Sequence, residues 1–403
     1  MLKTALKISI NLMFLCSVAY SQENRNSLTY LTSKLQSFVD NNTTEKVYLQ
    51  FDRLYYVAGD TVYFKAYITM GERHEPSTLS KVLHVDLINN ASKIDQSIKL
   101  QIDSGGAWGD FALPDSLPTG SYRIRAYTQW MRNYDDRDFF DKVFYVGAIV
   151  SNTVTSNSKR NVQPIEVKPD IQFFPESGVW VNGIRSKMAF KAIGANGLGI
   201  GVQGIITDNQ NKEVCSFEAT HLGMGYCYIK PAEGQMYKAI VTYADGVRDT
   251  VKLPAPEASG IVLSVDNDSI AKAVVKIETN KTYYEINHQK AYSLVIYSGG
   301  KIITVACKLD STEIRLNILK RRLHTGIATF TLFSADGEPL CERILFVQNY
   351  EQLGINVNTD KAVYQKREKV LLHLNVKNRA DSSVMGHFSI AVTDERKDRK
   401  SVV

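Results

Sequence analysis

Apolar and polar residues alternate along most of this 403-residue chain, and this alternation limits the fold more than any other feature. In VYFKAYIT, residues 62–69, Val, Phe, Ala and Ile share one face, while Tyr, Lys, Tyr and Thr share the other. Residues 83–87 and 122–127 repeat the pattern, and Gly, Asn, Asp and Pro separate such segments. Period-2 segments predict antiparallel strands with one buried face. The sequence therefore predicts an all-β fold of tandem immunoglobulin-like antiparallel β-sandwiches.

The first residues follow a different pattern. Lys3 and Lys7 precede the apolar run Ile8–Val18, and small residues follow. This three-part pattern predicts a secretory signal over residues 1–21, cleaved between Ser21 and Gln22. The run is too short to span a bilayer, which takes about 20 residues. Residues 22–42 then carry apolar side chains at a helical period and predict a short N-terminal helix: Leu28, Leu31, Leu35 and Phe38.

The charge balance excludes one class of partner. Cleavage of residues 1–21 removes two lysines and no acidic residue, which takes the formal net charge from +6 to +4. No dense Lys/Arg stripe accompanies this small excess, so we expect no nucleic-acid partner. No second long apolar run occurs, so we also expect no transmembrane span and an exported, mature chain.

Three breaks in the alternation predict module boundaries. Residues 151–164, SNTVTSNSKRNVQP, are polar and aperiodic and predict a linker. Residues 253–260 and 348–354 form shorter breaks. The predicted sandwiches therefore cover residues 43–150, 165–256 and 257–348, with an incomplete fourth over 349–403. The last six residues, DRKSVV, read like translated sequencing adapter, so we expect 398–403 to be artefactual and the natural chain to continue.

A turn between two strands occurs twice. EKVYLQFDRLYYVAGDTVYFKAYI, residues 45–68, recurs in diluted form as LGINVNTDKAVYQKREKVLLHLNV, residues 353–376. In the first copy we expect Gly59 to adopt positive φ and Asp60 to bond its own turn. Tyr56 is predicted to pack its ring on the sandwich edge and to anchor its hydroxyl.

The second copy keeps two of these residues and changes one. Tyr364 and Glu368 take the places of the tyrosine and the aspartate, but Arg367 stands where the first copy has glycine. The backbone of the second turn must therefore either be less demanding in φ at this position or be strained.

The best candidate for binding is the polar face of the first sandwich. Aromatic and cationic side chains interleave there, a pattern that suits a glycan or a protein partner of the cell envelope. The alternative is that these residues only pair across strands. The predicted face consists of Tyr63, Lys65, Tyr67, Arg123, Arg125, Tyr127, Trp130 and Arg132.

The cysteines leave two possibilities open. After removal of the signal, four remain, and none has C-x-x-C spacing. Cys215 and Cys227 flank a predicted hairpin loop and could form a disulfide in an oxidising compartment. The alternative is two buried free thiols. Cys307 and Cys341 could equally pair or stay free.

Motifs for chemistry are weak throughout. IDSGG, residues 102–106, lacks the context of a serine nucleophile, and VDNDS, residues 265–269, lacks the turn glycine of a calcium loop. We expect no catalytic residue, no cofactor and no metal site, and hence no enzyme.

Several motifs together resemble a known family. VYLQFDRLYYVAGDTVYFKAYI and GDFALPDSLPTGSYRIRAYTQWMRN resemble the second macroglobulin domain of the alpha-macroglobulin family. FFPESGVWVNG, with Ser177 where glycine is usual, and FSIAVTDE are similar to later modules of exported Bacteroidota proteins of this kind, some of which carry a TonB-receptor plug domain. The resemblance implies macroglobulin-type sandwiches in the periplasm or at the outer membrane.

Two functions follow from the resemblance. One is a non-catalytic scaffold or binding protein, the N-terminal part of a larger envelope protein linked to TonB-dependent uptake. The alternative is a proteinase-trapping inhibitor, whose Cys-Gly-Glu-Gln thioester is missing from this chain. A carbohydrate-active enzyme would need paired carboxylates that the sequence does not reveal.

Overall fold

The computed structural model describes residues 28–147, 169–244, 246–349 and 351–392, which divide into two compact units. One unit holds residues 38–147 with 351–392, and the other holds residues 28–37 with 169–349. The predicted signal peptide with its cleavage site at Ser21 and Gln22, the predicted linker and residues 398–403 lie outside the described residues. The module limits that the sequence predicts stay a prediction.

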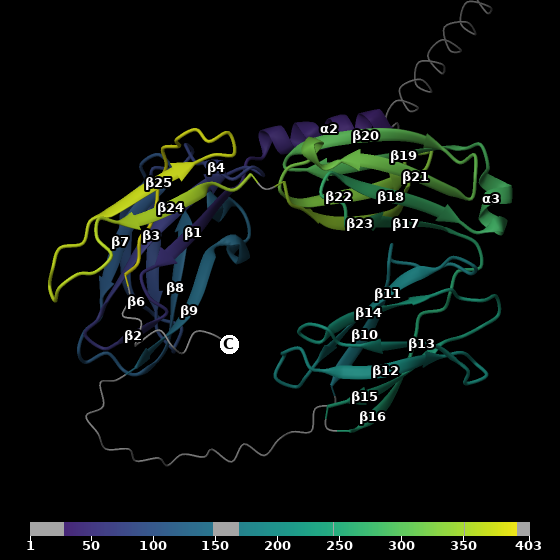
Figure 1. Cartoon of the computed structure of the whole chain (residues 1–403), viewed down its shortest axis with the longest axis horizontal. Coiled ribbons are helices and arrows are strands. Elements are labelled where there is room, and N and C mark those ends of the chain that lie inside the picture. Colours follow the sequence, from purple (N-terminus) through teal and green to yellow (C-terminus); the bar gives the residue numbers. More distant parts are fainter. Residues whose placement is uncertain (1–27, 148–168, 245, 350, 393–403) are drawn as a thin grey trace, which may run out of the picture. The chain divides into compact units, whose positions relative to one another are not determined.

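Residues 45–147 form a sandwich of two sheets (Figure 1). One sheet has the order β1-β3-β7, with β4 also on β3, and the other has the order β2-β9-β8-β5-β6. All pairs are antiparallel except β2 with β9. The elements are β1 (Glu45–Phe51), β2 (Tyr55–Val57), β3 (Thr61–Met70), β4 (Glu75–Pro76), β5 (Val82–Ile88), β6 (Ile94–Gln101), β7 (Gly106–Ala112), β8 (Gly120–Thr128), β9 (Phe140–Gly147) and the 3-10 turns η1 (Met131–Asn133) and η2 (Asp136–Asp138).

Alternate residues of both sheets meet in one core. Ala66 and Ile68 of β3, Val85 of β5 and Ile124 of β8 are fully buried in the same apolar cluster. Burial follows a strict period of two along β1, β3 and β8. The predicted all-β sandwich fold is therefore confirmed.

The other unit contains two further sandwiches. Their sheets have the orders β10-β11-β14 and β13-β12-β15-β16, then β17-β18-β21 and β20-β19-β22-β23. The elements are β10 (Asp170–Pro175), β11 (Ser186–Ile193), β12 (Val202–Thr207), β13 (Glu213–Glu218), β14 (Met224–Ile229), β15 (Lys238–Tyr243), β16 (Arg248–Lys252), β17 (Ile261–Asp266), β18 (Lys272–Thr279), α3 (Lys281–Asn287), β19 (Ala291–Ser298), β20 (Lys301–Lys308), β21 (Glu313–Leu319), η3 (Lys320–Arg322), β22 (Gly326–Phe333) and β23 (Pro339–Val347).

All three sandwiches share one strand plan. Three strands pair in one sheet and four in the other, and β1-β3-β7 with β6-β5-β8-β9 follows the same order as the later two sandwiches. In the first sandwich β2 and β4 are additions to this plan. The remaining strands, β24 (Gly354–Thr359) and β25 (Leu372–Lys377), pair as a hairpin and correspond by sequence repeat to β1 and β3.

The predicted N-terminal helix is also confirmed. It is α2 (Leu28–Asn41), and its apolar stripe is not buried, because Phe38 remains 63% exposed. Among the described residues, no helix combines the length and the apolar character needed to cross a bilayer.

Candidate functional site

The first repeated turn carries the chain from one sheet of the sandwich to the other. After β1 the chain adds β2 to the edge strand β9 by parallel pairing, and it then returns to the first sheet as β3. Gly59 has φ +86°, and a Cβ there would come within 2.3 Å of an oxygen of Asp115. Only glycine fits this position, as the sequence predicts. We call residues 52–63 the first hinge.

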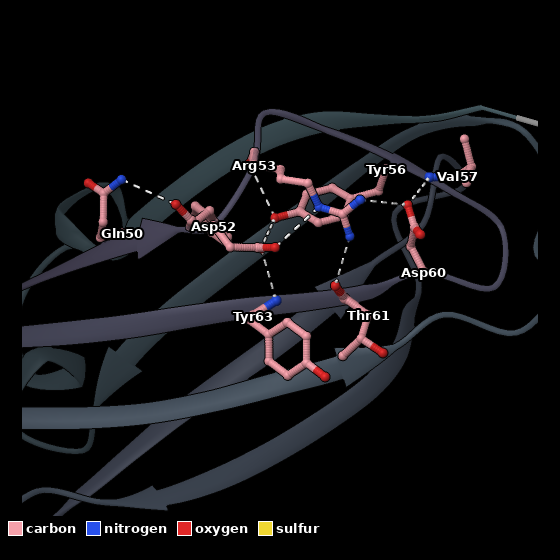
Figure 2. Close-up of polar contacts among 9 residues, drawn as sticks. Gln50, Asp52, Arg53, Tyr56, Val57, Asp60, Thr61 and Tyr63 are labelled. Atoms are coloured by element: carbon pink, nitrogen blue, oxygen red, sulfur yellow. Dashed lines mark hydrogen bonds and ion pairs between the residues drawn. The ribbon is translucent and has the colours of Figure 1, made fainter. Parts of the chain in front are cut away.

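Partly buried polar contacts hold the first hinge together (Figure 2). The Tyr56 hydroxyl, on a side chain only 3% exposed, donates to Asp52 Oδ1 at 2.7 Å. The same oxygen accepts from the amide of Tyr63 at 3.2 Å, and Asp60 Oδ2 accepts from the amide of Val57 at 2.9 Å. Burial, and then the hydrogen bond to the carboxylate, raises the pKa of Tyr56. The predicted roles of the tyrosine and of Asp60 are confirmed.

An arginine joins the two carboxylates of the first hinge. Arg53 Nε lies 3.2 Å from Asp52 Oδ2, and its Nη1 lies 3.3 Å from Asp60 Oδ2. The guanidinium also lies over the ring of Tyr56, 5.0 Å from its centroid. The charged groups of this cluster thus bind one another, and the arrangement stabilises a turn.

The second hinge, residues 360–371, repeats the main hydrogen bonds of the first hinge. Asp360 Oδ1 accepts from the Tyr364 hydroxyl at 2.5 Å and from the amide of Leu371 at 2.9 Å. Glu368 Oε2 accepts from the amide of Gln365 at 2.7 Å, and its other oxygen pairs with Lys361. Each of these residues lies 308 positions after its counterpart in the first hinge.

Arg367 decides between the two alternatives left by the sequence. It has φ +66°, in the left-handed region that Gly59 occupies in the first copy. The second turn therefore demands the same backbone conformation, and a residue with a side chain adopts it at a cost.

The predicted binding residues do not form one face, which corrects the sequence interpretation. Tyr63, Lys65 and Tyr67 lie on β3, whereas Arg123, Arg125 and Tyr127 lie on β8 in the other sheet. Because both strands turn their alternate residues into the same core, these side chains leave the sandwich on opposite sides. Alternation in the sequence predicts which residues of a strand point into the core and which point outward, but it does not reveal to which sheet the strand belongs.

The β8 residues pair across strands, as in the alternative interpretation. Arg123 and Arg125 lie 3.5 and 3.4 Å from the same oxygen of Asp141 on β9. Tyr127 stacks between two neighbouring rings, those of His84 and Phe139, at centroid distances of 5.3 and 4.8 Å.

The last two predicted residues follow β8. Trp130 Nε1 donates to the carbonyl of Thr43 at 2.9 Å, and Arg132 donates to the side chain of Gln129 at 3.4 Å. Both side chains thus make contacts near the end of β8.

The β3 residues lie on a surface that is richer in aromatic side chains than the sequence indicates. Strand register places Tyr48 of β1 opposite Tyr67, and Trp108 of β7 opposite Lys65. Tyr48, Tyr63 and Trp108 are 56, 57 and 67% exposed. We call these five residues the β3 outer face. The sequence interpretation missed the tyrosine of β1 and the tryptophan, because finding them requires the strand register.

An extended segment of the same unit contacts this surface. Lys65 Nζ donates to the main-chain carbonyl of Phe388 at 3.1 Å, and the Tyr67 hydroxyl donates to Ser389 Oγ at 3.0 Å. The β3 outer face therefore holds a non-helical stretch of polypeptide, partly through its backbone.

A buried carboxylate was also missed by sequence reasoning. Glu45, the first residue of β1, is 3% exposed. Its two oxygens accept from the hydroxyls of Ser77, Ser80 and Thr128 and from the amide of Ser80. This carboxylate joins β1 to the segment before β5 and to the end of β8. Glu45 shares its face of the strand with the buried Val47, Leu49 and Phe51, but its hydroxyl partners lie between 32 and 83 positions away in the sequence.

The predicted cysteine pair lies across the two sheets of the second sandwich. Cys215 is on β13 and Cys227 on β14, and these strands pair with β12 and β11 and not with each other. An isolated antiparallel bridge between His221 and Met224 closes a tight turn between the two cysteines, but the predicted hairpin does not extend to the strands that carry them. Both thiols are free in the structure. Their mutual hydrogen bond lowers the pKa of Cys215 and raises that of Cys227, to which burial adds.

The other two cysteines stay unpaired as well. Cys307 and Cys341 are free thiols, and burial raises the pKa of both, to about 12 for Cys341. In the described part of the chain, no three His, Cys, Asp or Glu side chains are placed to hold a metal ion.

Fold and sites together define a multi-domain, β-rich protein built of sandwiches with structural hinges. Residues 46–141 match the MG2 domain family, so the first sandwich is an MG2 domain of the alpha-macroglobulin type. The match begins in β1 and ends in β9, and it includes the first hinge and the β3 outer face.

Three of the solved structures to which the chain is similar are bacterial proteins. One is Escherichia coli alpha-2-macroglobulin activated by porcine elastase, 11% identical, with a TM-score of 0.29 over 83% of this chain and 33% of that one. A second is a Salmonella alpha-2-macroglobulin, 11% identical, with a TM-score of 0.24 over 84% and 26%. A third is dimeric latent PorU from Porphyromonas gingivalis, 14% identical, with a TM-score of 0.30 over 75% and 34%.

The chain spans between about a quarter and a third of the length of these three proteins. None of the curated proteins matches it.

Proposed function

We propose that this chain is a non-catalytic, exported scaffold of a bacterial cell envelope, and that its MG2 domain docks an extended polypeptide on the β3 outer face. The observation that carries the proposal is the pair of bonds from Lys65 and Tyr67 to the segment Phe388–Ser389. The signal-like N-terminus supports export, and the MG2 domain supports a role outside the cytoplasm.

The chemistry of the face favours a protein partner. A lysine that binds a main-chain carbonyl recognises any extended peptide, whatever its sequence. Exposed tyrosine and tryptophan side chains add contact area at low conformational cost, which is typical of interface centres. The contacts of Phe388 and Ser389 on the face support this mode of binding. A partner would either displace these two residues or bind beside them on Tyr48, Tyr63 and Trp108.

Site-specific photo-crosslinking in the source cells tests both parts of the proposal. A photoreactive amino acid replaces Tyr63 or Trp108 on the face, or Val143, which is 62% exposed on the other sheet, as the matched control. We expect an adduct with an envelope protein from the first two positions only, and its loss when Lys65→Ala is added. Equal adducts from Val143, or a chain that stays in the cytoplasmic fraction, would contradict the proposal.

The finer role that we infer is support of TonB-dependent uptake at the outer membrane. It rests on the resemblance to exported macroglobulin-domain proteins, and the identity of the crosslinked protein tests it.

The second candidate, a proteinase-trapping inhibitor, rests on the MG2 domain alone. Incubating the natural full-length protein with a panel of proteinases distinguishes the two, because only a trap retains the proteinase after denaturation.

A further inference from the structure

A cleft lies between the second and third sandwiches, within one compact unit. Its volume is about 600 Å³, within the range of roughly 300–1,000 Å³ that is usual for small-molecule sites. One wall consists of β11 and β14, and the other of β17, β18 and β23.

Direct contacts between the two sandwiches fix the walls of the cleft. The Ser177 hydroxyl donates to the carbonyl of Leu263 at 2.5 Å and accepts from its amide at 2.7 Å. An ion pair of 3.1 Å joins Arg343 to Glu176, whose side chain is 10% exposed. The site is therefore held open by the junction itself.

The wall formed by β11 and β14 carries a cluster of cations and tyrosines. The Arg185 guanidinium lies 4.0 Å from the ring centroid of Tyr228, and Lys187 Nζ lies 4.9 Å from that of Tyr226. The two rings meet edge to face at 5.8 Å. A cation therefore lies over each ring, and Tyr226, at 55% exposed against 42% for Tyr228, offers the larger open aromatic surface.

The charges in the cleft are unevenly compensated. Three of its cations have carboxylate partners: Lys276 with Glu278 at 2.6 Å, Arg315 with Glu313 at 2.6 Å and Arg343 with Glu176 at 3.1 Å. Arg185 and Lys187 form no ion pair with any described residue. The Nε of Arg343 is buried and likewise lacks an acceptor among the described residues.

The opposite wall carries negative charge. Asp266 and Asp268, at the end of β17, line the cleft and form no ion pair within the described part of the chain. A ligand must therefore present an anion to the β11–β14 wall and hydrogen-bond donors to the β17 end.

We propose that this cleft binds an acidic oligosaccharide, a sugar chain that carries carboxylates. The carboxylate of a uronic acid fits Arg185 and Lys187, the ring fits the exposed face of Tyr226, and hydroxyls donate to Asp266 and Asp268. A peptide of acidic residues fits less well, because its side chains carry no hydroxyl groups that could donate to those two aspartates. The site is separate from the β3 outer face, so a negative result for one proposal does not contradict the other.

Calorimetric titration of the full chain with short oligomers of galacturonic, glucuronic or mannuronic acid tests the proposal. The methyl esters of the same oligomers keep the ring and the hydroxyls but lose the charge. We expect at least one free acid to bind, and its ester to bind at least about tenfold more weakly, since a charge-assisted hydrogen bond is lost. Failure of all three acids, or equal binding of the ester, overturns the proposal.

Variants locate the site. Arg185→Gln combined with Lys187→Gln is expected to weaken binding of the acid at least about tenfold. Lys191→Gln serves as the control, because this lysine lies on the same face of β11 but does not line the cleft. All variants should keep the melting profile of the parent chain, since the substituted side chains are on the surface. Equal loss in the control, or tighter binding of poly-glutamate than of any uronate, also refutes the proposal.

Discussion

Removal of one hydroxyl from the first hinge gives the sharpest test of its proposed structural role. Tyr56→Phe keeps the buried ring and deletes only the donor to Asp52 Oδ1, 2.7 Å away. A hydrogen bond to a charged group contributes about 1.5–3 kcal/mol. Asp52 keeps the amide of Tyr63 and the guanidinium of Arg53 as partners, so we expect a loss at the lower end, about 1.5–2 kcal/mol.

A local measurement suits this chain, because a multi-domain protein does not unfold in one two-state transition. Hydrogen exchange followed by mass spectrometry reports the opening of the turn through the amides of Val57 and Tyr63, which both donate to hinge carboxylates. A loss of 1.5–2 kcal/mol accelerates exchange of these amides by about 10–30-fold. Exchange in the second and third sandwiches should not change.

Two further tyrosines serve as controls. Tyr55, next in the chain and 62% exposed, has no side-chain bond to a described residue, so Tyr55→Phe should leave exchange at the parent rate. Tyr364→Phe deletes the equivalent bond in the second hinge, where Asp360 is exposed and Tyr364 is only half-buried. We expect an effect below about 1 kcal/mol there, since water replaces the lost donor. The reasoning is refuted if Tyr56→Phe exchanges at the parent rate, or if Tyr55→Phe has an equal effect.

Three other substitutions or treatments test features of the fold. Arg367→Gly should stabilise the second hinge by about 0.5–1 kcal/mol, because positive φ costs arginine more than glycine. Slower exchange of the β25 amides would show this stabilisation. The reciprocal substitution, Gly59→Arg, should disrupt the first hinge. Glu45→Gln should destabilise the MG2 domain by about 2–3 kcal/mol, because an amide cannot accept from all four donors, and an unchanged melting temperature would contradict this. Mild oxidation should link Cys215 to Cys227 before it links either remaining cysteine, and peptide mapping without reduction would reveal a different pairing.

The alternation of apolar and polar residues was sufficient to predict the sandwiches. In β3 and β8 each apolar residue of the pattern is buried, because a strand between a core and water has only two environments to offer. The hinge was predictable for a related reason. Gly59, Asp60 and Tyr56 act within one turn, so their contacts depend on residues that are close in sequence.

Contacts between distant strands were not predictable in this way. The outward residues of β3 and β8 look alike in the sequence, yet they belong to different sheets. The burial of Glu45 depends on Thr128, which lies 83 positions away. The same limit applies to the predicted hairpin at Cys215 and Cys227, since two strands adjacent in the chain can pair with different neighbours.

The two hinges together show which part of the turn is encoded locally. Around the second hinge, β24 is exposed along its whole length, so none of the described residues forms a core behind that strand. Its carboxylates nevertheless accept the same amide and hydroxyl donors as those of the first hinge. The hydrogen bond to Tyr364 is the largest of the causes that lower the pKa of Asp360, so this carboxylate interacts more strongly as an anion. The pattern Asp-(Lys/Arg)-x-x-Tyr followed by an acidic residue thus accompanies the same turn contacts both beside a buried strand and beside an exposed one. This favours a turn that is encoded locally, to which burial in the sandwich adds stability.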